Sequence, residues 1–405
     1  YLDLYPDDKI TSASFPENES DIKLLLNGVY AQLREKEVYN QGLFGFGITD
    51  GATPNAFNWG TDEVFNKLGA GRLSSSDGGV VTYRWKRCYE IISRANYLLA
   101  CMDLVDLSEE AKAKYSGETH FLRGLAYSVL AETYGGVPII LTNISTEEAR
   151  SLKRASLEET WQQALDDYEV AITNLGVDAP EPGRATKGAA LGMKMRAYLY
   201  QGKYKEVLSC VEQIDALKKY GLFHSYEGLF DPANENNKEV LFDIQYIEGE
   251  NSQGSYIDQY CGTGTGSWTR GSRYVPTDDL VAAYETIDGS PVDPENPYEN
   301  RDPRLGFTAV LPGSYFLGYR FPNYLYPGGA FNHAGNRLKH LSTRKYRIQD
   351  ESKLPPSGQS YINDIILRYA DVLLSKAEAI IETNGNVADA IAILNRIRTE
   401  RDDVK

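Results

Sequence analysis

Two loops of the sequence carry residues that could bind a sugar. The first, DGATPNAFNWG, contains Asp50, Asn55 and Trp59 in a stretch without the apolar periodicity that would bury the indole. Sugar rings have apolar CH faces that stack on indole and phenol rings, and their hydroxyl groups pair with carboxylate, amide and guanidinium groups. This loop offers both kinds of contact, so we predict that Asp50, Asn55 and Trp59 bind ligand.

The second loop, CGTGTGSWTRGSRY, is also rich in glycine, serine and threonine. It contains Trp268, Arg270, Arg273 and Tyr274, which again combine aromatic rings with groups that donate hydrogen bonds. We predict these four residues as a second set of ligand contacts. The other tryptophans, Trp85 and Trp161, lie within helical periodicity and are predicted in the core.

Motifs for covalent chemistry are missing from the sequence. There is no GxSxG, no HExxH and no P-loop, and GTGTGS lacks the third glycine of a dinucleotide-binding turn. The four histidines and four cysteines are not spaced as metal ligands. We therefore predict no catalytic residue and no cofactor. A glycosidase pair of carboxylates is spatial rather than sequential, and the sequence leaves open both that activity and the presence of calcium.

The charge of the chain excludes some partners. A formal net charge of −15 and the lack of a long basic run argue against a nucleic-acid surface or a general attraction to anionic lipid. No apolar stretch approaches the length of a membrane-spanning helix. The opening residues, YLDLYPDDKI, lack the features of a signal peptide, so we expect any export signal to have been removed.

Helices dominate the elements that must position the two loops. Apolar residues spaced three and four apart predict helices over residues 18–36, 78–103, 108–134, 157–175, 186–201, 204–219, 277–285, 369–383 and 387–400. The clearest strand alternation is in KEVLFDIQY, so any sheet is small. We predict a mainly α fold with a little β.

The helix that ends at Tyr134 runs into Gly135, Gly136 and Pro138. Both glycines can adopt the left-handed conformation that closes a helix, and proline cannot continue one. We expect the chain to leave as an extended segment at 137–141. Small residues such as Gly124 on the same helix predict close approach of a neighbouring helix.

Helical hairpins recur along the chain. The stretches around Gly202 and Gly385 place apolar residues at matching offsets in a helix, turn, helix unit that resembles a tetratricopeptide repeat. The helices at 118–134 and 157–175 fit the same scheme with an inserted loop at 138–155.

Between the hairpins the composition changes to glycine, proline, asparagine and tyrosine. Within a single unit of 405 residues, we predict a helical part over 1–220, a loop-rich lobe over 221–360 and a further helical hairpin over 361–405. An insertion of this length is typically functional or packed as its own lobe.

A series of motifs in this order resembles the SusD/RagB-like outer-membrane nutrient-binding lipoproteins of Bacteroidetes. The motifs are YLDLYPDDKITSASF, SDIKLLLNGVYAQL, WKRCYEIISRANYLL, ETHFLRGLAYSVLAETYGGVPII, GRATKGAALGMKMRAYLYQGKY, NKEVLFDIQY, PTDDLVAAYETIDG, NRDPRL and IILRYADVLLSKAEAI. Each motif alone is weak, but their order along nearly the whole chain is specific.

The resemblance implies a tetratricopeptide-like scaffold held at the outer membrane by a lipid on a cysteine upstream of residue 1, facing the cell exterior. It also implies a SusC-like TonB-dependent transporter as partner and sugar binding from loops that match the two described above. Family members continue past LNRIRTERDD into an aromatic and proline-rich stretch that this sequence lacks.

We predict a non-catalytic protein that captures an oligosaccharide for uptake. Two alternatives remain open at this stage: the same fold carrying a peptide, and a repeat scaffold that binds only proteins. The charged motif NRDPRL is interpreted as structural, with Arg301 and Asp302 holding loops by charge-assisted hydrogen bonds.

Overall fold

The computed structural model describes residues 15–34, 50–58, 67–74, 76–248, 254–255, 257, 274–317, 319–320, 332–333, 336–337, 341–355 and 359–404. The chain forms two compact units, each assembled from separate parts of the sequence. The first comprises residues 1–33, 84–219 and 375–387, and the second comprises residues 34–83, 220–374 and 388–405. Helices α13 and α14 each cross from one unit to the other, and α4 begins just before the first unit.

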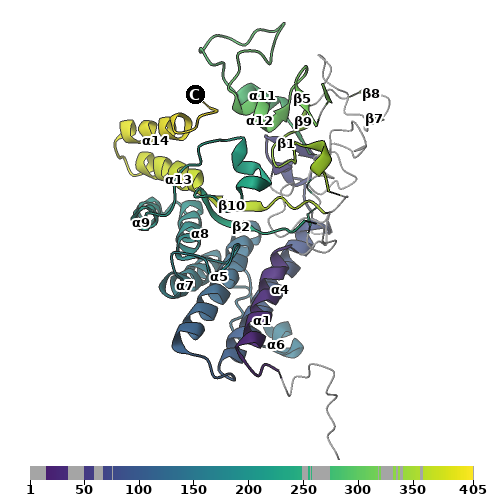
Figure 1. Ribbon diagram of the computed structural model, residues 1–405. Helices are drawn as coiled ribbons and strands as arrows, with labels where there is room; N and C mark the ends of the chain where they lie inside the picture. Colours follow the sequence, from purple (N-terminus) through teal and green to yellow (C-terminus); the bar gives the residue numbers. More distant parts are fainter. Residues whose placement is uncertain are drawn as a thin grey trace, which may run out of the picture. The chain divides into compact units, whose positions relative to one another are not determined.

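The first unit is helical. Its elements are α1 (Glu19–Ala31), α4 (Val80–Met102), α5 (Glu109–Tyr134), α6 (Thr146–Ser151), α7 (Leu157–Asn174), α8 (Lys187–Tyr200), α9 (Tyr204–Ala216) and α13 (Tyr369–Glu382), with a 3-10 turn η1 (Gln32–Arg34) after α1. Helix α5 packs against α7, α7 against α8, and α8 against α9 (Figure 1). The predicted mainly helical class and the hairpin around Gly202 are confirmed.

Helices α5 and α7 approach closely because Gly124 has no side chain. A Cβ atom at this position would lie 3.0 Å from Cβ of Asp167 and 3.1 Å from the carbonyl oxygen of Ala164. Next to it, the Arg123 guanidinium donates to both carboxylate oxygens of Asp167, at 2.7 and 3.0 Å, and to Asn96 Oδ1 at 2.8 Å. The small residue therefore allows the close contact, and the buried ion pair fixes its register.

The two glycines after α5 have different roles. Gly135, the C-cap of α5, has a φ of 77°, which favours glycine, but its ψ of −136° lies outside the left-handed helical region. Gly136 is not left-handed, which corrects the prediction for that residue. It is small because the backbone leading into α7 passes over it, and a Cβ there would lie 2.1 Å from the carbonyl oxygen of Ala155. The inserted loop also contains α6, which the sequence did not predict.

The two helical tryptophans differ in burial. Trp161 is 6% exposed and belongs to the core as predicted. Trp85 is only half-buried, which corrects the prediction. Its ring packs against those of Tyr89 and Tyr134, at centroid distances of 5.0 and 5.2 Å.

The second unit consists mainly of loops tied by short antiparallel ladders. These pair β1 (Ala56–Asn58) with β3 (Tyr274–Pro276), β2 (Val240–Ile244) with β10 (Asp364–Arg368), β4 (Ala309–Val310) with β9 (Ser342–Thr343), β5 (Tyr315–Phe316) with β6 (Tyr319–Arg320), and β7 (Asn332–His333) with β8 (Asn336–Arg337). The predicted strand near Val240 is confirmed, whereas β10 was not predicted. Its apolar residues run continuously into α13 and show no alternation.

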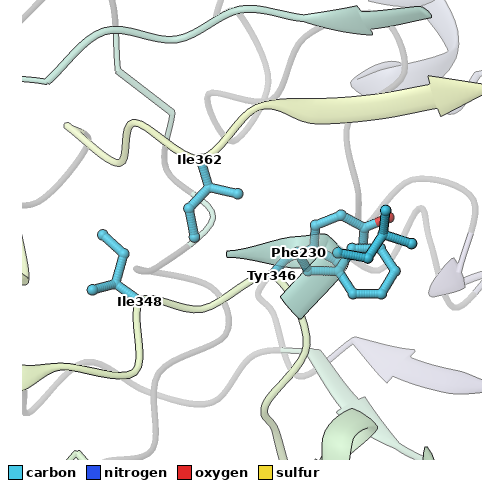
Figure 2. Packing of buried hydrophobic residues seen from close by; sticks show 5 residues of the cluster. Phe230, Tyr346, Ile348 and Ile362 are labelled. Carbon is cyan, nitrogen blue, oxygen red and sulfur yellow. The ribbon is translucent and has the colours of Figure 1, made fainter. Parts of the chain in front are cut away.

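Short helices complete this unit: α11 (Asp278–Ala283), α12 (Arg304–Thr308), α14 (Val387–Thr399) and the 3-10 turns η2 (Gly228–Phe230), η3 (Pro232–Asn234) and η4 (Glu351–Lys353). An apolar cluster holds the loops together. The rings of Phe230 and Tyr346 pack at a tilt of 58° with their centres 4.7 Å apart, and Ile348 and Ile362 belong to the same cluster (Figure 2). The loops therefore have a small core of their own.

Candidate functional site

A cavity of about 180 Å³ lies within the second unit. This volume is below the roughly 300–1,000 Å³ of a complete small-ligand pocket, so the cavity suits one ring of a larger molecule. Its walls combine polar, aromatic and aliphatic side chains. The lining residues are Asp50, Asn55, Ala56, Tyr226, Pro276, Leu280, Tyr284, Thr308, Thr343 and Lys345.

The short β1–β3 ladder joins the first predicted ligand loop to the strand that begins at Tyr274, the last residue of the second predicted loop. Its register pairs Ala56 with Pro276, and Asn58 with Tyr274. Just past the ladder, the backbone N–H of Thr277 donates to the carbonyl of Asn55 at 3.1 Å. Residues more than 200 positions apart in sequence therefore meet at one edge of the cavity.

Two of the predicted site residues, Asp50 and Asn55, line the cavity. Tyr274 lies at the start of β3, opposite Asn58. The other four, Trp59, Trp268, Arg270 and Arg273, lie outside the described residues. Asn58 immediately precedes Trp59 in the sequence, and Tyr274 is the last residue of the second predicted loop. The ligand role of all seven residues stays a prediction.

A carboxylate and an ammonium group, from Asp50 and Lys345, line the same cavity. The Nζ atom of Lys345 lies 4.4 Å from the ring centre of Phe230, 5.1 Å from that of Tyr346 and 5.8 Å from that of Tyr226. Cation–π attraction therefore stabilises the charge. Burial raises the pKa of Asp50, and the nearby Lys345 charge offsets part of that rise.

Both groups retain hydrogen-bonding capacity. Among the described residues, neither the Asp50 carboxylate nor the Lys345 ammonium has a hydrogen-bond or ion-pair partner. One accepts hydrogen bonds and the other donates them, and both line the cavity. A ligand with adjacent hydroxyl groups could satisfy both.

Two tyrosines form the aromatic part of the wall. The Tyr284 hydroxyl is 2.9 Å from Thr308 Oγ1, and burial raises its pKa. Burial also acts to raise the pKa of Tyr226, but the charges of Lys345 and Arg368 outweigh this effect and the net pKa is lowered. Both rings lie half-buried at the cavity, where their faces could contact the CH groups of a sugar.

Arg301 of the NRDPRL motif holds the carboxyl end of α11, which Tyr284 directly follows. Its guanidinium donates to the carbonyls of Val281 and Tyr284, each at 2.5 Å, and to that of Pro297 at 2.7 Å. Asp302 in turn pairs with Arg304 at 2.5 Å. The structure thus agrees with the interpretation of this motif as structural, because Arg301 ties down the carboxyl end of α11.

Several cavity residues were missed by the sequence reasoning, among them Tyr226, Tyr284, Thr308 and Lys345. Tyr226 and Lys345 come from loops about 120 residues apart, and neither loop shows periodicity that would mark it. Tyr284 lay within a quoted motif, PTDDLVAAYETIDG, but its position at a helix end resembles that of an ordinary packing residue.

The described residues contain no group of three or more histidine, cysteine or acidic side chains that could hold a metal ion. Of the described residues that line the cavity, Asp50 alone carries a carboxyl group, whereas glycosidases generally use two. Within the same part of the chain, no helix combines the length and apolar character needed to cross a bilayer.

Fold and cavity together define a helical-repeat protein with a cavity in its loop-rich unit. Residues 1–199 match a SusD-like family described as starch-binding and associating with the outer membrane, and residues 238–401 match the SusD family. SusD-like protein P25 of Formosa agariphila is 26% identical over 98% of this chain and 78% of its own.

Comparison with solved structures shows the same fold in SusD-like proteins. A SusD-like carbohydrate binding protein of Bacteroides fragilis has a TM-score of 0.84 at 26% identity, covering 96% of this chain and 80% of its own. A laminarin binding SusD-like protein shares the fold, with a TM-score of 0.73 at 21% identity over 95% of this chain and 84% of its own. The chain belongs to the SusD/RagB-like family, a carbohydrate-binding family associated with the outer membrane.

Proposed function

We propose that this protein captures an oligosaccharide at the cell surface and passes it to a SusC-like TonB-dependent transporter, without a covalent step. A lipid on a cysteine upstream of residue 1 would hold it in the outer membrane, facing the exterior. The observation that carries the proposal is the cavity in which Asp50, Asn55 and Lys345 combine with the rings of Tyr226 and Tyr284.

The chemistry of the cavity fits a sugar ring. Hydroxyl groups donate to Asp50 and accept from Lys345, while the tyrosine rings contact the CH face. The volume of about 180 Å³ accommodates part of a ligand, so the remainder would extend along the two loops that meet at β1 and β3. Trp59 and Trp268 on those loops are proposed to stack on neighbouring rings, with Arg270 and Arg273 as donors.

Calorimetric titration with maltohexaose, laminarihexaose and trigalacturonate tests the proposal. Asp50→Asn and Lys345→Met keep the shape of each side chain but remove its charge. Each should weaken binding roughly 10-fold to 100-fold, because a hydrogen bond to a charged group contributes about 1.5–3 kcal/mol. Trp59→Ala and Trp268→Ala should weaken it as well.

The matched control is Tyr200→Ala, which removes a half-exposed ring at the end of α8 in the other unit. It should leave the dissociation constant within about 2-fold of wild type. If the dissociation constant were unchanged in both Asp50→Asn and Lys345→Met, the cavity would not be part of the ligand-binding site.

A peptide is the second candidate ligand. One observation favours it, because the opposite charges of Asp50 and Lys345 also complement the ammonium and carboxylate groups of a peptide. Titration with a mixed library of short peptides separates the two. Binding of peptides and of none of the three sugars would replace the carbohydrate proposal.

A further inference from the structure

The three residues Arg401, Asp402 and Asp403 follow α14 and contact a loop far away in sequence. They form hydrogen bonds with residues 223–227, the loop that carries the cavity residue Tyr226. None of the three lines the cavity itself. They therefore connect to the ligand site only through the loop that they hold.

The Asp403 carboxylate accepts three hydrogen bonds from residues 225–227. Oδ1 accepts from the backbone N–H of Tyr226 at 2.8 Å. Oδ2 accepts from Ser225 Oγ at 2.7 Å and from the backbone N–H of Glu227 at 3.0 Å. Beside it, the N–H of Asp402 donates to the carbonyl of His224 at 2.7 Å. Charge-assisted bonds to consecutive backbone groups define the path of the loop on both sides of Tyr226.

Arg401 reinforces the same loop from a buried position. It is 1% exposed and its Nη2 donates to both carboxylate oxygens of Glu239, at 2.7 and 2.9 Å. Its Nη1 donates to the carbonyl of Phe223 at 3.2 Å, and Glu239 accepts from the Phe223 N–H at 2.7 Å. The guanidinium carbon also lies 5.6 Å from the ring centre of Tyr226.

Tyr226 needs this support because its own side chain is only partly enclosed. Its ring packs edge-on against Phe230 at 5.5 Å and lies 5.8 Å from Nζ of Lys345. Movement of the 223–227 backbone would thus displace Tyr226, which is part of the cavity wall and one of the three rings around Lys345.

We propose that residues 401–403 are a positioning element for ligand binding, which sets Tyr226 against the cavity through Asp403 and the buried Arg401–Glu239 pair. The inference rests on the proposed function in so far as the positioned cavity binds a ligand. Ligand affinity then depends on residues that the ligand does not touch.

The test is Asp403→Ala, with Glu400→Ala as the matched control. Glu400 lies one residue before Arg401 and pairs with Arg396 in a half-exposed position, so its loss should leave the loop unchanged. Hydrogen exchange gives the first readout and needs no ligand. In Asp403→Ala the amides of Tyr226 and Glu227 should exchange at least 10-fold faster, while the Phe223 amide, bound by Glu239, stays protected.

The second readout is the affinity for whichever of maltohexaose, laminarihexaose and trigalacturonate binds wild type most tightly. Asp403→Ala should weaken binding about 10-fold. In a Tyr226→Ala background the same change should weaken it less than about 2-fold, because the group being positioned is gone.

The outcomes separate this inference from the proposed function. Unchanged exchange at Tyr226 and Glu227 overturns the positioning role. An equal loss of affinity with and without Tyr226 also overturns it, since Asp403 would then act by general loosening. Failure of all three sugars to bind wild type contradicts the proposed function, and the exchange result alone then decides whether residues 401–403 place the loop.

Discussion

Replacing Gly136 by alanine should strongly destabilise the helical unit. The added Cβ would lie 2.1 Å from the carbonyl oxygen of Ala155, 2.7 Å from the carbonyl carbon of Ser156 and 2.9 Å from the amide nitrogen of Leu157. All three are backbone atoms at the start of α7, so rotation of a side chain cannot relieve the overlap. The backbone at 155–157 must move.

The size of the effect follows from the contacts that this movement breaks. Val137 accepts from the Ala155 N–H at 3.1 Å and donates to Thr160 Oγ1 at 3.2 Å, and Arg154 donates to the Gly136 carbonyl. Each hydrogen bond contributes about 1 kcal/mol. Loss of the Ser156 helix cap adds about 1 kcal/mol. The free energy of unfolding should therefore fall by about 3–4 kcal/mol.

The assay is urea unfolding followed by far-UV circular dichroism, with inspection for separate transitions of the two units. Gly176→Ala is the matched control in the same unit. Its Cβ would meet the carbonyl oxygen of Asp178 at 3.5 Å, an ordinary contact, so stability should change by less than about 1 kcal/mol. If the free energies of unfolding of the two alanine variants differed by less than about 1 kcal/mol, the close approach of the backbone to Gly136 would not require a glycine there.

Two further perturbations test the second unit. Arg301→Ala removes the guanidinium donor from the carbonyls of Val281, Tyr284 and Pro297. At about 1 kcal/mol for each lost hydrogen bond it should cost about 3 kcal/mol in thermal or urea unfolding, and Arg301→Lys should cost less; a loss under about 1 kcal/mol for alanine would contradict this. Burial, the larger cause, and the nearby acidic groups raise the pKa of Glu235 from 4.5 to about 7. The folded state thus retains the proton, and the stability present below the unfolded pKa is lost as pH rises through about 7. Glu235→Gln should be more stable than wild type by about 1–2 kcal/mol near pH 8, after discounting for solvent screening, with no gain near pH 4; parallel stability–pH curves for the two proteins would refute the assignment.

Much of the helical unit could be predicted from sequence. The spacing of apolar residues located α5, α7, α8 and α9. The capping box of Ser156 and Glu159 at the start of α7 is likewise a pattern of residues three apart in the sequence. These features are local, because a helix satisfies its backbone hydrogen bonds within a few residues. The end of the helix at Tyr134 was predicted, but the reason for a glycine at position 136 was not. The need for glycine at position 136 arises from a backbone 19 residues later, which no local pattern reveals.

The candidate site divides in the same way. Residue type and loop composition were enough to select Asp50 and Asn55 as candidates, because a polar loop without apolar periodicity can be recognised in the sequence. Both residues line the cavity. Lys345 and Tyr226 entered the cavity only through the tertiary structure. Their positions depend on strands of two or three residues and on the Asp403 contacts, which join distant segments. A sequence can state which groups are able to bind, but the closing of long loops decides which of them share one cavity.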